Sequence, residues 1–438
     1  MSASKHSSKR QKMQSFASAV DELHTFKRKW AGWTTIESEP VIWNQLLRDI
    51  GAQNTQVQEI YGLDEESFTH VNPSYGIIFC LVFNTDYDKS EQETVCPAGL
   101  WFANQVPENA CATYALLNII MNSSISLSPE LASFKDYSYD LTPPYKGLAV
   151  ASFEFLKGAH NSFGRKTEMD EFDLGLVKTF NDSKRKAKPR EHKKGKKAQE
   201  EDELDEDDLA YHYIAYVHVD GAIWELDGLK RQPVRVHTCA HEDWLASMGP
   251  KLRERIALYP DAVGRFACLA LVPERLPTYR AELLSNATLL GVVETTLQSR
   301  DPSWRSFVTK DTQDNYIIIP THPPVDSVEN AEIRALATTQ DLFDRHTKLR
   351  MMQTDIRQKI SDCEKGLAEE ATIVERTRHD YEPFIREAAR LLTRNGRTRG
   401  IHDPNWRSNL GKKRGGVKAK RGAAKTRGKR GGKRGGKR

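Results

Sequence analysis

The sequence lacks long apolar runs. None approaches the roughly 18 residues that a transmembrane helix needs, so no membrane-spanning segment is expected. No apolar stretch follows the Ser/Lys-rich residues 1–12, so we expect no secretory signal. Cysteine is scarce, at six residues in 438, and no two cysteines have CxxC spacing. Their thiols are therefore expected to be reduced, as in the cytosol or the nucleus.

The last 28 residues lack acidic and aromatic side chains. Residues 411–438 contain 14 Lys or Arg and nine Gly, whereas residues 1–410 have a net charge of −9. Such a tail cannot bury a core, and we predict that it is disordered. Its basic residues are candidates for contacts with DNA phosphates, beginning with Lys412, Lys413, Arg414, Lys418, Lys420 and Arg421. A nuclear-import signal is the alternative. Recognition of single strands is not expected without aromatic residues for base stacking.

The chain is long enough for several folded units. It is 38% hydrophobic and 29% charged, which allows at least one sizeable core beside solvated sequence. We predict an N-terminal tail over residues 1–30 with a short helix near 16–30, a mixed α/β domain over 31–275, a helical domain over 279–395 and a tail over 396–438. No internal repeat is visible.

Apolar patterns in the α/β domain predict both helices and strands. Glu39-Pro40 begins a helix that Gly51 ends, and helices are also expected at 57–63 and 110–121. Continuous apolar runs at 76–84 and 266–272 predict buried strands. Residues 211–226 predict a β-hairpin, since Asp220-Gly221 is a favoured two-residue turn between strand-like segments.

Residues 164–210 interrupt this pattern. Nine basic residues lie between 184 and 197, and eight acidic residues lie between 200 and 208. Because blocks of opposite charge offer almost no apolar anchor, we predict a mobile loop.

The helical domain contains a long heptad pattern. One apolar row consists of Leu342, Leu349, Ile356 and Cys363, and a second row consists of His346, Gln353, Ile360 and Leu367. Two polar residues in the second row favour a partner-dependent or antiparallel helix over a robust dimeric coiled coil. The alternative is a solvated helix that packs on its own domain. A shorter helix is predicted at 381–393.

Cys111 is the cysteine most suited to chemistry. Asn109 is a good N-cap for a helix that begins at Ala110, which would place Cys111 in the first helical turn. The helix dipole and free backbone amides there favour a thiolate, the form that attacks. A small buried core residue is the alternative.

The hairpin supplies a base for this cysteine. With a turn at Asp220-Gly221, Ile214 pairs with Asp227, and His212 becomes a diagonal neighbour of Asp227. Such Cβ atoms lie about 7–8 Å apart, a distance that a carboxylate–imidazole hydrogen bond can span. Asp227 could then fix the tautomer of His212, which could activate a nucleophile. An exposed cross-strand pair is the alternative.

Gln105 could complete the site. It lies six residues before Cys111, where its side-chain amide could donate to a developing oxyanion beside the Cys111 amide. Taken alone, Gln105 fits an ordinary polar loop residue much better. His237, Cys239 and His241 have alternate-residue spacing, but no fourth ligand is evident, so we expect no metal site.

Three segments together resemble the ubiquitin C-terminal hydrolases. They are NQVPENACATYALLN around Gln105 and Cys111, HNSF at 160–163, and YHYIAYVHVDGAIWELDGLK around His212 and Asp227. The resemblance covers about residues 31–275. It implies a papain-like α/β catalytic domain that cleaves after the C-terminal glycine of ubiquitin without a cofactor. Cys111 then resembles the nucleophile, His212 the general base, Asp227 its orienting residue and Gln105 the oxyanion donor. Ala112 departs from the glycine of many members, although larger members also have alanine there. Residues 164–210 resemble the crossover loop.

The sequence at 377–387 is similar to the closing helix of an extension found in the two larger subfamilies. One of these serves the proteasome, and the other is a nuclear histone deubiquitinase of Polycomb-type complexes. Resemblance to either subfamily implies a partner, an adaptor protein with a deubiquitinase-adaptor domain. The absence of a several-hundred-residue insert favours the proteasomal subfamily. The basic tail favours the chromatin subfamily, which we prefer. We therefore expect the protein in the nucleus, with the cytoplasm as a second location.

Two readings from other classes remain open. One is a non-catalytic adaptor that holds ubiquitin on chromatin or the proteasome, against which the complete Cys/His/Asp/Gln set argues. The other is an acyl transferase of the transglutaminase type, which shares the order Cys, His, Asp. Reaction with a ubiquitin probe carrying a C-terminal electrophile separates the hydrolase from both.

Overall fold

The computed structural model describes residues 22–82, 91–186, 211–258, 266–307 and 338–394 apart from residue 380, with residues 333 and 335. Two compact units divide the chain, one ending at Arg378 and the other beginning at His379. No helix among these residues is both long enough and apolar enough to cross a membrane.

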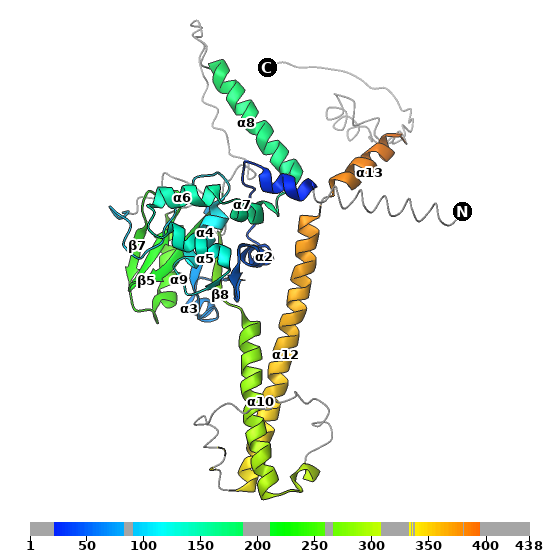
Figure 1. The fold of residues 1–438 in the computed structure, drawn as a ribbon. Coiled ribbons are helices and arrows are strands. Elements are labelled where there is room, and N and C mark those ends of the chain that lie inside the picture. The colour runs from blue at the N-terminus through cyan, green and yellow to red at the C-terminus, as the bar shows by residue number, and fades with distance from the viewer. Residues whose placement is uncertain are drawn as a thin grey trace, which may run out of the picture. The chain divides into compact units, whose positions relative to one another are not determined.

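A six-stranded antiparallel sheet forms the centre of the α/β domain in the first unit (Figure 1). Its strands run in the order β2 (Thr55–Glu59), β8 (Phe266–Pro273), β3 (Gly76–Val82), β5 (Tyr211–Val219), β6 (Ala222–Leu226) and β7 (Val234–Thr238). A separate short pair joins β1 (Ala52–Gln53) and β4 (Ser126–Leu127). On β3, Ile77 and Phe79 belong to one core, and Ile78 and Cys80 to the other. Burial on both faces explains why this strand is a continuous apolar run.

Helices cover both faces of the sheet. The larger core contains residues of α2 (Pro40–Ile50), α4 (Cys111–Ile120), α5 (Pro129–Ser138), α6 (Pro143–Ser152) and α7 (Glu154–Asn161). The smaller core contains residues of α3 (Glu65–Thr69) and α9 (Trp244–Ala257). In α4 every residue after Cys111 is buried, as expected of a central helix. The structure confirms the predicted α/β fold class.

The main strand predictions are confirmed, and one helix prediction is wrong. Helix α2 begins at Pro40 and ends before Gly51, whose φ of 85° is the left-handed conformation that glycine adopts readily. The helix predicted at 57–63 is instead strand β2 and the loop that follows it. Thr55 and Val57 alternate with less buried residues, and Val57 pairs with Leu271 of β8. Pairing along the sheet edge therefore outweighed the helical spacing.

The segment predicted as a mobile loop begins with a helix, so that prediction is wrong for residues 166–186. They form α8 (Lys166–Lys186), while residues 187–210, which include most of the charged blocks, lie outside the described residues. The start of α8 packs on the N-terminal segment, where residues 22–29 are helical. Met169 is fully buried, and the indole of Trp30 donates to the carboxylate of Asp173 at 3.1 Å.

A helical hairpin follows the sheet in the first unit. Helix α10 (Arg275–Arg300) and η3 (Trp304–Phe307) lead to α12 (Thr339–Arg378), which lies beside α10 (Figure 1). Arg280 pairs with Glu364 and Glu294 with His346, so the two helices are antiparallel. The heptad row of α12 faces this partner, since Leu342, Leu349 and Ile356 are buried. Of the two arrangements predicted for this helix, the structure shows the antiparallel one, with α10 of the same chain as the partner.

The far end of α12 attaches to the α/β domain. Val374 belongs to the larger core, and Glu370 accepts from Asn44 at 3.0 Å and pairs with Arg48 at 3.1 Å. The guanidinium of Arg378 donates to Ser162 Oγ at 2.8 Å and lies 4.4 Å from the ring centroid of Phe163. The extension thus meets the α/β domain at helix α2 and at the HNSF segment.

The second unit contains α13 (Glu382–Arg394). Phe384, Ile385, Leu391 and Leu392 of this helix are exposed. The basic tail, with its six candidate DNA contacts, lies outside the described residues. The domain limits predicted from the sequence stay predictions.

Candidate active site

The β5–β6 hairpin positions the histidine. Asp220 and Gly221 have φ of 50° and 73°, the left-handed values of a type I′ turn. The ladder runs from the pair Val219–Ala222 to the pair Ala215–Leu226, in the predicted register. It ends there, so Asp227 lies just beyond the last paired residue of β6.

His212 and Asp227 form a buried pair. Nε2 of His212 donates to Oδ1 of Asp227 at 2.7 Å, and the backbone N–H of Leu229 donates to the same oxygen at 2.9 Å. Both residues are 5% exposed. Burial alone would lower the pKa of His212, but hydrogen bonds to Asp227 and Cys111 outweigh it and raise the pKa to about 9. Burial would raise the pKa of Asp227, yet the bond from His212 lowers it.

Cys111 is the first residue of α4. The predicted N-cap at Asn109 is wrong by one residue, because Ala110 occupies that position and makes no side-chain cap. Asn109 instead has a φ of 62°, a left-handed conformation that asparagine tolerates better than most residues. The backbone amides of the first turn have no partner within the helix, so the half-buried thiol lies at the positive end of the helix dipole.

Helix α4 also positions the segment that carries Gln105. Asn118 accepts from the backbone N–H of Ala103 at 3.1 Å, and Asn122 accepts from that of Trp101 at 2.8 Å. The Gln105 side chain donates through Nε2 to the carbonyl of Pro107 at 3.1 Å. This bond orients the amide and leaves its second N–H available to a substrate oxygen.

Sequence reasoning missed the role of His160, which was noted only within the HNSF segment. It is fully buried, with Nδ1 2.7 Å from Thr113 Oγ1 and Nε2 2.6 Å from the carbonyl of Thr34. Burial lowers its pKa to about 4, so the ring is neutral, accepts from Thr113 and donates to Thr34. It therefore ties α4, two residues after Cys111, to the N-terminal segment.

The other thiols differ from Cys111 in their surroundings. Burial raises the pKa of Cys80 to about 12, and burial also raises the pKa values of Cys96, Cys239 and Cys268. Among these five thiol groups, that of Cys111 is the one whose sulfur is hydrogen-bonded to a histidine ring, that of His212.

The alternate-residue cluster does not converge. Nδ1 of His241 lies 3.1 Å from Nδ1 of His218 on β5. Where the structure describes the chain, no three His, Cys, Asp or Glu side chains gather in a group that could hold a metal ion.

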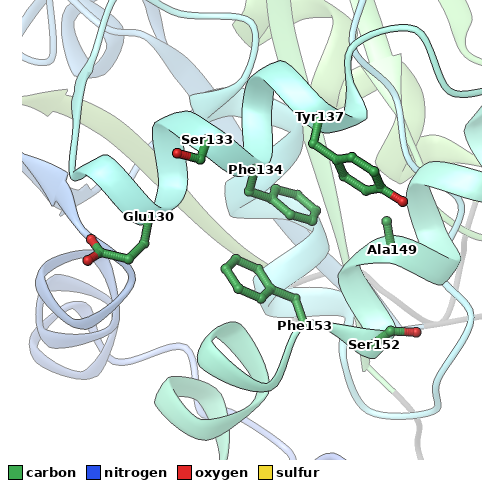
Figure 2. Close-up of a pocket in the computed structure, with 7 residues that line it drawn as sticks. All are labelled: Glu130, Ser133, Phe134, Tyr137, Ala149, Ser152 and Phe153. Carbon is green, nitrogen blue, oxygen red and sulfur yellow. The ribbon is translucent and has the colours of Figure 1, made fainter.

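A separate apolar hollow lies between α5 and α6 (Figure 2). It has a volume of about 510 Å³, and the rings of Phe134 and Phe153 stack in it 5.0 Å apart. Tyr137 of α5 and Ala149 of α6 also line it. None of the residues proposed for the chemistry lines this hollow.

Comparison with known proteins gives the family. The model of ubiquitin carboxyl-terminal hydrolase, family 1, matches residues 33–257, about half of the chain. The chain belongs to this family. It is a cysteine-type deubiquitinase with a papain-like α/β domain and a helical extension.

Similar curated proteins have names from the same family. Ubiquitin carboxyl-terminal hydrolase isozyme L5 of Dictyostelium discoideum is 32% identical over 255 residues, which cover 58% of this chain and 66% of that protein. Ubiquitin carboxyl-terminal hydrolase ubh-4 of Caenorhabditis elegans is 26% identical over 385 residues, 85% of this chain and 90% of that protein. The Trichinella spiralis UCH37 catalytic domain, solved with ubiquitin vinyl methyl ester, is 28% identical with a TM-score of 0.43 and covers 55% of this chain and 96% of that chain.

Proposed function

We propose that Cys111 is the nucleophile of this deubiquitinase, with His212 as general base, Asp227 as its orienting residue and Gln105 as an oxyanion donor. The observation that carries this assignment is the placement of His212, hydrogen-bonded to both Cys111 and Asp227. A base held between a nucleophile and an orienting carboxylate is the arrangement that activates thiols and hydroxyls.

The steps follow from this geometry. His212 accepts the thiol proton, and Asp227 stabilises the imidazolium that forms. The Cys111 thiolate attacks the carbonyl carbon of ubiquitin's last glycine. The oxyanion receives hydrogen bonds from the Cys111 backbone amide and Gln105 Nε2. His212 then protonates the leaving amine, and water, deprotonated by His212, hydrolyses the thioester to free ubiquitin and thiol.

We further propose that the conjugate is ubiquitin on a nucleosomal histone, with the basic tail bound to DNA. The support is the charge of residues 411–438, 14 positive in 28, on a chain that is otherwise net acidic. If about half of these charges neutralise a phosphate, log affinity falls with log salt with a slope near −6. A proteasomal location is the runner-up, favoured by the absence of a long insert.

Truncation after Asn409 tests the tail. Activity on ubiquitinated nucleosomes should fall and its salt dependence flatten, while hydrolysis of a soluble ubiquitin–fluorophore stays unchanged. A tail of shuffled order but equal composition should restore activity, because phosphate contacts do not depend on sequence. Equal losses on both substrates, or no loss on either, would contradict the chromatin proposal.

The proposed adaptor site is the α10–α12 hairpin, which exposes Leu284, Met351 and Met352. An adaptor protein with a deubiquitinase-adaptor domain would cover these apolar side chains. Met351→Glu and Leu284→Glu should weaken adaptor binding and abolish stimulation without changing basal hydrolysis. Unchanged stimulation in both variants would count against this surface.

A further inference from the structure

Two segments that carry proposed site residues touch each other. The backbone N–H of Gln105 donates to the carbonyl of Gly228, one residue after Asp227, at 2.8 Å. A Cβ atom on Gly228 would lie 3.0 Å from the Cβ of Gln105 and 3.1 Å from its backbone nitrogen. Any larger residue at 228 would therefore require the Gln105 segment to shift by a few tenths of an ångström, so glycine lets the two segments approach this closely.

Asn104 makes the second link between these segments. Its side-chain Nδ2 donates to the carbonyl of Lys230 at 2.6 Å, across 126 residues of sequence. Both bonds join consecutive residues of one segment, 104 and 105, to the four-residue segment 227–230 that follows β6. The Asn104 bond uses a side chain, whereas the Gln105 bond uses the main chain. A substitution at 104 can therefore remove the bond to Lys230 and leave the bond to Gly228 in place.

The backbone of Asn104 is itself fixed by α6. Its N–H donates to the carbonyl of Pro143 at 3.1 Å. A Cβ atom on Gly147 would lie 2.0 Å from the carbonyl oxygen of Asn104, so the helix is in close contact with this segment. The side chain of Asn104 therefore extends from a fixed point to the loop.

The loop has its own internal restraints. Lys230 N–H donates to the carbonyl of Asp227 at 3.0 Å, and Lys230 Nζ donates to the buried Glu225 at 2.5 Å. Glu225 also accepts from Tyr216 at 2.8 Å and pairs with Arg255 at 3.4 Å. These contacts preserve the shape of the loop, whereas Asn104 fixes its position relative to Gln105.

We propose that Asn104 is a positioning residue of the active site: its bond to Lys230 holds the oxyanion donor Gln105 in register with the His212–Asp227 pair. This inference rests on the proposed roles of those three residues. Misplacement of a reacting group by about 1 Å can cost on the order of 10²-fold in rate. One lost link, with the Gln105–Gly228 bond still present, should cost on the order of 10-fold in kcat.

Kinetics of Asn104→Ala and Asn104→Asp on a fluorogenic ubiquitin substrate test the proposal, each in the native and Gln105→Ala backgrounds. Asp keeps the shape of the side chain but cannot donate to a carbonyl when ionised. In the native background kcat should fall on the order of 10-fold with KM within about twofold. In the Gln105→Ala background the same changes should cost less than about twofold, because the side-chain donor that Asn104 aligns is already absent.

The matched control is Asn286→Ala. Asn286 also donates one side-chain bond to a main-chain carbonyl, that of Leu349 at 3.1 Å, in the helical hairpin. It should lower the melting temperature and leave kcat unchanged. The pH profile of Cys111 alkylation by iodoacetamide should be unchanged in Asn104→Asp, since the bonds within the His212–Asp227 loop remain.

The outcomes are distinguishable. Equal fold-losses in both backgrounds would make Asn104 merely structural, and a rise in KM alone would make it a substrate-binding residue. Either result overturns the inference, as does an unchanged kcat in the native background. A failure of the proposed function would be seen in a different variant: the Gln105→Ala single substitution would leave kcat unchanged.

Discussion

Nε2 of His212 lies 2.7 Å from Oδ1 of Asp227, although Asp227 lies beyond the last paired residue of its strand. The hairpin register brings the two residues near each other, and the Leu229 N–H bond to the same carboxylate oxygen fixes the rotamer. Strand pairing thus provides proximity, and the loop after β6 provides orientation.

Asp227→Asn should lower the pKa of His212 from about 9, because burial, which disfavours the charged ring, remains after the carboxylate charge is removed. NMR titration of the imidazole measures this shift. The wild-type pair stabilises the fold fully below about pH 6.5, and this contribution is lost as pH rises towards 9. The difference in unfolding free energy between the two proteins should therefore shrink over that window. A constant difference would argue against the pair as its source.

The same substitution should lower kcat by a large factor with little change in KM. Its effect falls on the imidazolium formed during attack, not on the broad surface that binds ubiquitin. Steady-state kinetics on a ubiquitin–fluorophore give both constants. A rise confined to KM would assign Asp227 to substrate binding.

Gln105→Ala should lower kcat on the order of 10²-fold, the usual loss for one oxyanion donor. Gln105→Glu serves as a control of similar size that lacks the amide donor and should be no better. If Glu retained full activity, the donor role would be wrong.

Acid should destabilise the protein through His160. Its folded pKa of about 4 lies below the ordinary value of 6.5, so its contribution is fully present above pH 6.5 and is lost as pH falls towards 4. The full loss is on the order of 3 kcal/mol. Denaturant unfolding of wild type and His160→Gln between pH 7 and 4 measures it. Equal acid slopes in the two proteins would contradict this source.

Short-range rules predicted much of the site. The Asp-Gly turn sets the register that carries His212 towards Asp227, and an apolar run predicts the helix of Cys111. The N-cap prediction failed because Asn109 adopts a left-handed conformation, which spacing does not reveal.

Long-range contacts account for what the sequence did not show. Residues 57–59 form an edge strand because β8 is available as a partner, and α8 begins where Trp30 and Met169 supply an anchor. His160 and Asn104 act through main-chain carbonyls far along the chain, at Thr34 and Lys230. Every residue has the same main-chain carbonyl whatever its side chain, so no sequence pattern marks these partners.

The most direct test of the central assignment is intact-mass and peptide-mapping analysis after reaction with a ubiquitin probe that carries a C-terminal electrophile. Wild type should form a single adduct at Cys111. Cys111→Ala should form none and should not hydrolyse a ubiquitin–fluorophore, yet should still bind ubiquitin. Cys80→Ala, a control for loss of a nearby buried thiol, should react as wild type does if it folds. An adduct at another cysteine, or turnover by Cys111→Ala, would contradict Cys111 as the nucleophile.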